Sequence, residues 1–302
     1  MTKQPRYVDT EKCIACGACA EKCPRKVDDE YNEKTARRKA IYIPYAQAVP
    51  QKYVIDHDNC IYFEKGKCRA CEKFCPAGAV KFDEQPQSIT LEVGAVVLSP
   101  GFSAFDPTGI STWGYGSFKN VITSMELERF LSASGPTEGH LIRPSDLKEV
   151  SRIAFLQCVG SRDINKGDHG YCSSVCCTYA IKQAMIAKDH VKDLDVSIFY
   201  MDMRTHGKEF ERYLERARDL GIQFRRCRVH SLEPVQETDN VYFRYISDQG
   251  KQIEDEYDMV VLSVGLCTPR SAVDLADRLG VGLNKSRFVR STSFNPVATT
   301  RD

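Results

Sequence analysis

The pattern of hydrophobic and polar positions changes near residue 86. Beyond that point short apolar runs alternate with stretches whose apolar residues recur at helical spacing. The runs predict strands at residues 89–99, 152–157, 196–201, 222–224 and 257–263, and the helical stretches are residues 173–189 and 208–220. Gly221 follows the second helical stretch, as is typical of a helix C-terminus. Strands that alternate with helices predict an α/β fold with a parallel sheet.

Residues 1–85 show a different pattern, dense in cysteine and containing an internal repeat. Each copy ends in Cys-Pro, and the matching cysteines are Cys16, Cys19 and Cys23 in the first copy and Cys68, Cys71 and Cys75 in the second. Between the copies, apolar runs at residues 41–43 and 53–55 predict two short strands. We therefore predict two domains, a cysteine-rich module at residues 1–85 and an α/β domain at residues 86–302.

Composition and charge narrow the class of protein. The chain has 302 residues and a formal net charge of +1, which argues against a nucleic-acid partner. No apolar run is long enough to predict a membrane span, and the first residues do not resemble a secretory signal. We therefore expect a cytoplasmic protein whose fourteen cysteines bind metal or take part in redox chemistry rather than form disulfides.

The first cysteine motif is Cys13-x2-Cys16-x2-Cys19-x3-Cys23-Pro24, the spacing of bacterial ferredoxins that bind 4Fe-4S clusters. Two-residue gaps let three thiolates converge on one cluster, and the fourth cysteine leads away towards a second cluster. The alternative is a zinc site, but zinc sites usually pair two separated Cys-x2-Cys units. The spacing therefore favours an iron–sulfur cluster.

The second motif, Cys60-x7-Cys68-x2-Cys71-x3-Cys75-Pro76, repeats the first with a longer initial gap. If the crossed ligation of two-cluster ferredoxins holds, each cluster takes three cysteines from one copy and one from the other. One cluster is then bound by Cys13, Cys16, Cys19 and Cys75, and the other by Cys60, Cys68, Cys71 and Cys23.

A third set of cysteines lies in the α/β domain and comprises Cys158, Cys172, Cys176 and Cys177. Cys158 ends a predicted strand, the edge at which open α/β sheets bind ligands. Cys172 and Cys176 lie one helical turn apart, where unpaired amides favour an anionic cluster. No Gly-x-Gly-x-x-Gly motif occurs in the chain. The spacing fits a third 4Fe-4S cluster, and a zinc site or a redox dithiol remain alternatives.

Three stretches resemble the A-subunit family of heterodisulfide reductase: residues 38–50, residues 120–137, and the CVGSRD…YCSSVCC pattern that begins at Cys158. The resemblance implies a thioredoxin-reductase-like nucleotide-domain unit, here incomplete, with an inserted α+β two-cluster ferredoxin-like module. It also implies that the third cysteine set binds a cluster in the flavin domain. Lys182 resembles a lysine near the flavin ring, and Gly101 lies in a turn expected to contact the flavin.

The resemblance further implies an oxidoreductase subunit with three 4Fe-4S clusters and FAD. It would relay single electrons between ferredoxin or hydrogenase donors, FAD and the disulfide-reducing subunits B and C. The family's glycine-rich FAD motif is expected before residue 1, and a second FAD segment after Thr300. We therefore expect an interior piece of a longer protein that binds FAD weakly by itself. The alternatives are a flavin-free polyferredoxin-like electron carrier and a zinc-bound structural module.

Overall fold

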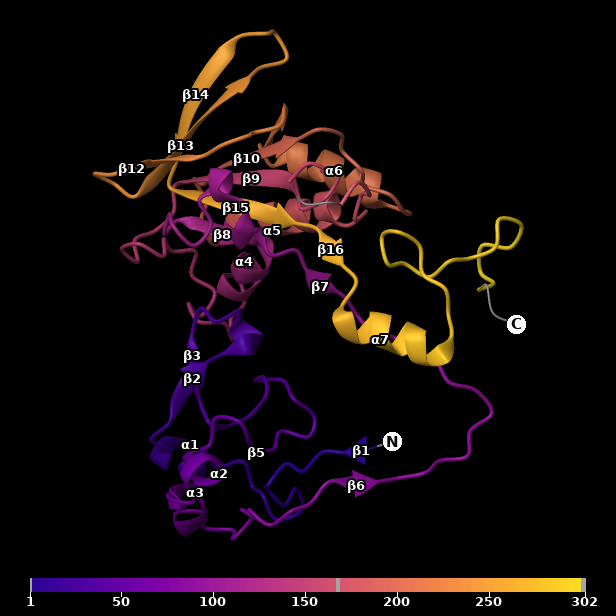
Figure 1. Ribbon diagram of the computed structural model, residues 1–302. Helices are drawn as coiled ribbons and strands as arrows, with labels where there is room; N and C mark the ends of the chain where they lie inside the picture. The colour runs from indigo at the N-terminus through magenta and orange to yellow at the C-terminus, as the bar shows by residue number, and fades with distance from the viewer. Residues whose placement is uncertain (1, 167–168, 300–302) are drawn as a thin grey trace. The chain divides into compact units, whose positions relative to one another are not determined.

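The computed structural model describes residues 2–166 and 169–299. The chain divides into two compact units, Met1–Val97 and Leu98–Asp302. Figure 1 shows the helices and strands of both units in chain order. Among the described residues, no helix is both long and apolar enough to cross a membrane.

The second unit is built on a five-stranded parallel sheet, which confirms the predicted α/β fold. The strand order is β11-β10-β9-β15-β8, and every neighbouring pair is parallel. The bounds are β8 Val121–Thr123, β9 Arg152–Val159, β10 Asp195–Tyr200, β11 Gln223–Arg226 and β15 Met259–Val264. The apolar runs of β9 and β15 are buried almost throughout, as expected for central strands covered on both faces. Because β9 and β15 are parallel neighbours, their carboxyl ends lie together at one edge of the sheet.

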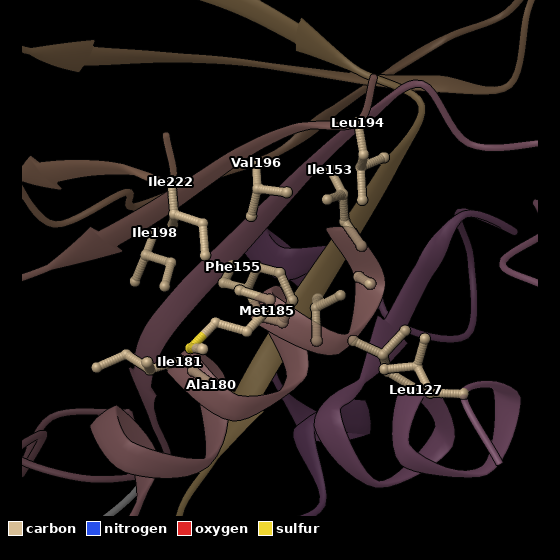
Figure 2. Close-up of a cluster of buried hydrophobic side chains, with 14 of the residues drawn as sticks. Leu127, Ile153, Phe155, Ala180, Ile181, Met185, Leu194, Val196, Ile198 and Ile222 are labelled. Atoms are coloured by element: carbon tan, nitrogen blue, oxygen red, sulfur yellow. The ribbon is translucent and has the colours of Figure 1, made fainter. Parts of the chain in front are cut away.

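One face of this sheet is covered by helices. These helices are α4 Ser124–Phe130, α5 Cys176–His190 and α6 Phe210–Asp219, while α7 Arg270–Leu279 belongs to the same unit but not to this core cluster. Figure 2 shows Phe155 of β9, Ile181 and Met185 of α5, and Ile198 of β10 in a single buried cluster. Helix α4 begins with a capping box, in which Thr123 and Glu126 exchange side-chain and backbone hydrogen bonds.

An antiparallel sheet and several aromatic side chains form the core on the other face. The strands are β12 Glu233–Val235, β13 Asn240–Ile246 and β14 Gln252–Tyr257, and each neighbouring pair is antiparallel. Phe199 of β10 lies against Phe243 and Tyr257, and these two rings stack with their centroids 5.3 Å apart. Shorter elements of this unit are β7 Ser103–Ala104, β16 Leu266–Cys267 and the 3₁₀ helices Pro107–Gly109 and Ser111–Trp113.

Two features of the sheet differ from the sequence prediction. The strand expected at residues 89–99 is wrong: only Gln87–Ser88 (β6) forms a strand, while Leu91 and Val97 lie exposed beyond it. An apolar run becomes a strand only where a neighbour supplies the ladder of hydrogen bonds. Conversely, β8 was not predicted; its three residues form a strand because β15 pairs with them.

The first unit consists of short elements around a small core. Its strands pair as β1 Thr2–Lys3 with β6, β2 Lys26–Asp28 with β3 Arg37–Lys39, and β4 Ile41–Tyr42 with β5 Val54–Ile55. The last pair confirms the two strands predicted between the cysteine motifs. The helices are α1 Ala18–Lys22, α2 Ile61–Lys65, α3 Ala70–Lys73 and the 3₁₀ helix Glu30–Asn32. Cys13 and Cys19 belong to the same buried cluster as Val8, Ile41 and Phe82. Small cores of this kind usually need an additional crosslink or metal.

Candidate metal centres

The cysteines of the first unit line two separate cavities. One cavity is lined by Cys13, Cys16, Cys19 and Cys75, and the other by Cys23, Cys60, Cys68 and Cys71. Each is a small cavity of about 20 Å³, and Ile41 contributes to the walls of both. Each cavity thus combines three cysteines of one repeat with one of the other, which is the grouping that crossed ligation requires.

Local backbone conformation turns these thiols inward. Gly17, between Cys16 and Cys19, has φ 87° and precedes the short helix α1 that carries Cys19. Ala15 and Cys68 also adopt positive φ, at 57° and 78°, which is rare for residues with a side chain. Such conformations persist where the surrounding structure imposes them, and they gather at functional sites.

Positive side chains lie close to the cysteine backbone of this unit. The Nζ atom of Lys52 donates a hydrogen bond to the carbonyl of Cys13, and that of Lys39 donates to the carbonyl of Cys23. The backbone amide of Ala79 donates to the Sγ atom of Cys75 at 3.3 Å. Ammonium groups and amides at these positions favour negatively charged sulfur in the cavities.

Burial controls the protonation of the metal-free thiols. It raises the pKa of Cys19 to about 11 and that of Cys71 to about 12, and it also raises the pKa of Cys60. Thiols with these pKa values are neutral at pH 7 and bind a metal only by releasing protons. Cys16 and Cys68 are the exposed cysteines of their cavities.

The third set of cysteines gathers at the carboxyl edge of the parallel sheet. Cys158 lies near the end of β9 with φ 64°, and Cys176 and Cys177 form the first turn of α5. Cys172 lies in the preceding loop. Burial raises the pKa of Cys176 to about 12, with smaller contributions from the other three cysteines, and burial also raises the pKa of Cys158 and Cys177. The structure therefore brings together the four residues that the sequence grouped.

Backbone groups from the end of β15, the loop after β10 and the cysteine loop itself surround this third set. The Sγ atom of Cys176 donates to the carbonyl of Val264 at 3.7 Å, and that of Cys177 donates to the carbonyl of Asp202 at 3.7 Å. The amide of Ser174 donates to the Sγ atom of Cys172 at 3.4 Å. The thiols are thus fixed by β15, by the loop after β10 and by their own loop.

These groups of cysteines differ in arrangement from a site that holds a single metal ion. Among residues 2–166 and 169–299, no three His, Cys, Asp or Glu side chains are placed to hold one metal ion. A 4Fe-4S cluster requires four thiolates around a volume, each bound to its own iron. The two cavities of the first unit have the cysteine content and the apolar walls that such a cluster needs.

Gly101 and Lys182, the predicted flavin contacts, lie in different surroundings. Gly101 lines a largely apolar cavity of about 440 Å³ in the second unit, between the residues before β7 and helix α7. Lys182 is not part of that lining; its Nζ atom forms an ion pair with Glu128 at 2.5 Å. Two further cysteines, Cys227 and Cys267, belong to none of the three groups, and Cys267 lines the cavity at Gly101.

Sequence reasoning missed the arginines around the third cysteine set. Arg162 follows Cys158 by four residues, and its Nη2 atom lies 2.8 Å from a carboxylate oxygen of Asp202. Arg204 lies 3.5 Å from the same oxygen, and Arg228 pairs with Asp163. Of these arginines, only Arg162 belongs to a motif noted in the sequence. Arg204 and Arg228 lie at the ends of other strands, far from the cysteines in sequence, so no local pattern predicted their position.

Comparisons with known proteins agree with this site. A 4Fe-4S binding domain family matches residues 6–27, which carry the first cysteine motif. The chain is 45% identical to the iron-sulfur A subunit of the CoB–CoM heterodisulfide reductase of Methanocaldococcus jannaschii, over 99% of this chain and 45% of the relative. It is 42% identical to the A subunit of the H(2):CoB-CoM heterodisulfide,ferredoxin reductase of Methanothermobacter marburgensis, with the same coverage. Over 99% of its length, the chain is therefore similar to A subunits of heterodisulfide reductase.

This finding confirms the resemblance drawn from the sequence. The relatives are named as subunits of heterodisulfide reductases, which are oxidoreductases, and this chain shares with them a segment that matches a 4Fe-4S binding domain. It spans about 45% of the length of the curated relatives it matches. Among solved structures, thioredoxin reductase of Lactococcus lactis aligns with 86% of this chain and 73% of its own, at 11% identity and a TM-score of 0.40. Likeness at that level carries no information on ligands.

Proposed function

We propose that this relative of the heterodisulfide reductase A subunits relays single electrons through three 4Fe-4S clusters. The observation that carries the proposal is the division of twelve cysteines into three groups of four, two of them lining cavities. The first cluster would be held by Cys13, Cys16, Cys19 and Cys75, the second by Cys23, Cys60, Cys68 and Cys71, and the third by Cys158, Cys172, Cys176 and Cys177.

A bound cluster supplies a site that accepts and releases one electron at a time. The chain's own residues would prepare that site. Ile41 and Phe82 exclude water from the sulfur, while Lys39 and Lys52 place positive charge on the cysteine carbonyls. The exposed Cys16 and Cys68 bring each cavity to the surface, where a redox partner could approach.

We further propose that the complete assembly exchanges electrons with ferredoxin or hydrogenase donors, with FAD, and with disulfide-reducing subunits B and C. The names of relatives support this: they include hydrogen, formate and ferredoxin beside the heterodisulfide. FAD would convert between electron pairs and single electrons. The cavity at Gly101 has the size for part of such a ligand.

A flavin-free, polyferredoxin-like electron carrier is the second candidate function. Two observations favour it for this chain. The 302 residues contain no Gly-x-Gly-x-x-Gly turn to hold a dinucleotide pyrophosphate. In addition, Lys182 is already bound to Glu128 and lies outside the lining of the cavity at Gly101.

Metal analysis tests the proposal. Chain purified without oxygen should contain about twelve iron atoms and as much acid-labile sulfide, because each cluster holds four of each. A value near eight would remove the third cluster from the proposal. Stoichiometric zinc in place of iron would show a structural zinc module and overturn the proposed electron transfer.

A further inference from the structure

Arg162 lies beside the third cysteine set, and only one of its two terminal nitrogens is paired among the described residues. Arg162 directs its Nη2 atom to Asp202 at 2.8 Å. Its Nη1 atom is buried and has no hydrogen-bond partner in the part of the chain that the structure describes. A buried donor without a partner is costly, particularly on a charged group, so its presence in a native site calls for an acceptor.

The surroundings of Arg162 identify the kind of acceptor. Its guanidinium interacts electrostatically with the thiols of Cys158 and Cys172, and also with that of Cys177. Its backbone amide donates to the carbonyl of Tyr171 at 2.9 Å, directly before Cys172 in the chain. The backbone of Arg162 therefore joins the two ends of the loop that carries these cysteines, and its guanidinium lies near their sulfur atoms.

Asp202 holds the guanidinium in this position. Its carboxylate binds Arg162, and its backbone carbonyl accepts from the Cys177 thiol at 3.7 Å. The same carboxylate also lies 3.5 Å from Arg204 and 3.9 Å from Arg226. One carboxylate among three arginines leaves an excess of positive charge at this edge of the sheet.

We propose that Arg162 donates a charge-assisted hydrogen bond from Nη1 to a sulfur atom of the cluster held by Cys158, Cys172, Cys176 and Cys177, and thereby raises its reduction potential. Arg162 is then a positioning residue for electron transfer and not a ligand. The inference rests on the proposed third cluster. Its physical basis is that reduction adds negative charge, which a nearby cation and a hydrogen bond to sulfur stabilise.

The test is a redox titration of the full 302-residue chain without oxygen, followed by electron paramagnetic resonance. The Cys176→Ala variant first assigns the signal of the third cluster, because that signal alone should vanish. Arg162→Gln should then shift the midpoint of this signal to lower potential, with the signals of the first unit unchanged. Arg162→Lys keeps the charge but loses the planar fork, so its shift should be smaller.

The matched control is Arg212→Gln, which removes an exposed arginine of α6 that pairs with Glu209 at 3.1 Å. It should leave every midpoint in place. Full iron content with an unshifted third midpoint in Arg162→Gln overturns the inference. If Arg162→Gln loses the iron of the third cluster, the midpoint of Arg162→Lys decides the question. Loss of this iron from both variants would show that Arg162 has a structural role and would overturn the inference. Full iron in Cys176→Ala would refute the third cluster itself, and the inference with it.

Discussion

The hydroxyl oxygens of Ser161 and Ser173 lie 2.6 Å apart, in hydrogen-bond contact. Ser161 follows Cys158 by three residues, and Ser173 directly follows Cys172. This hydrogen bond therefore closes the loop between the two cysteines. The Ser173 hydroxyl also accepts from the amide of Leu266 at 2.9 Å, which joins the loop to the chain beyond β15. The spacing of the third cysteine set thus depends on close contact between two segments distant in sequence.

Gly265 lies at this contact, and its substitution should disrupt the third site. A Cβ atom there would lie 2.3 Å from the Oγ atom of Ser161 and 2.8 Å from that of Ser173. Gly265→Ala must therefore displace the loop, and we expect the loss of about four iron atoms per chain. Gly109→Ala is the control, because its Cβ meets nothing within 4 Å. Full iron content in Gly265→Ala would contradict this account.

Crossed ligation in the first unit can be tested with pairs of alanine substitutions. Cys16 and Cys75 line the same cavity, so the double variant should lose no more iron than either single one, about four atoms. Cys16 and Cys23 belong to one motif but line different cavities, and their double variant should lose about eight. Iron analysis that gives the reverse order would show that each motif binds its own cluster.

The third site should be lost without affecting the first unit. Cys176→Ala should remove about four iron atoms and leave about eight, because its site lies in a separate compact unit. Iron and sulfide analysis measures this directly. Cys227→Ala, which replaces a half-buried thiol outside all three groups, should retain about twelve. Loss of all iron from Cys176→Ala would mean that the two units fold as one.

Flavin binding by this chain should be weak. Much of the affinity for a dinucleotide comes from its pyrophosphate, which needs a glycine-rich turn at a helix N-terminus. No Gly-x-Gly-x-x-Gly occurs in the 302 residues, and Lys182 is paired with Glu128. Fluorescence titration with FAD measures the affinity. Submicromolar binding, or flavin that co-purifies in stoichiometric amount, would be incompatible with this expectation.

The core beneath the parallel sheet should be sensitive to cavities. Phe155 is fully buried in the cluster of Figure 2, so Phe155→Ala should lower the free energy of unfolding by about 3–5 kcal/mol. Urea unfolding followed by the fluorescence of Trp113 reports on this unit, since it is the only tryptophan. Phe210→Ala, at a ring 40% exposed, should cost much less. Equal losses would show that Phe155 is not part of a tightly packed core.

Features that depend on neighbours along the chain could be read from the sequence. The runs of β9, β10 and β15 and the helix α5 were predicted because burial imposes a period on local residues. The ferredoxin-type motifs were recognisable because their thiols must converge within a few residues. The crossed grouping was also expected from the repeat, since a fourth cysteine four residues further on leads away from its own cluster.

Features that depend on partners distant in sequence were decided only by the tertiary structure. Residues 89–99 have the composition of a strand but form none, whereas the three residues of β8 become one beside β15. Arg162 meets Asp202, and Gly265 meets Ser161, because parallel strands bring their carboxyl ends to one edge. Hydrogen-bond ladders, close contacts and ion pairs between such segments have no local periodicity, so they arise only when the chain folds.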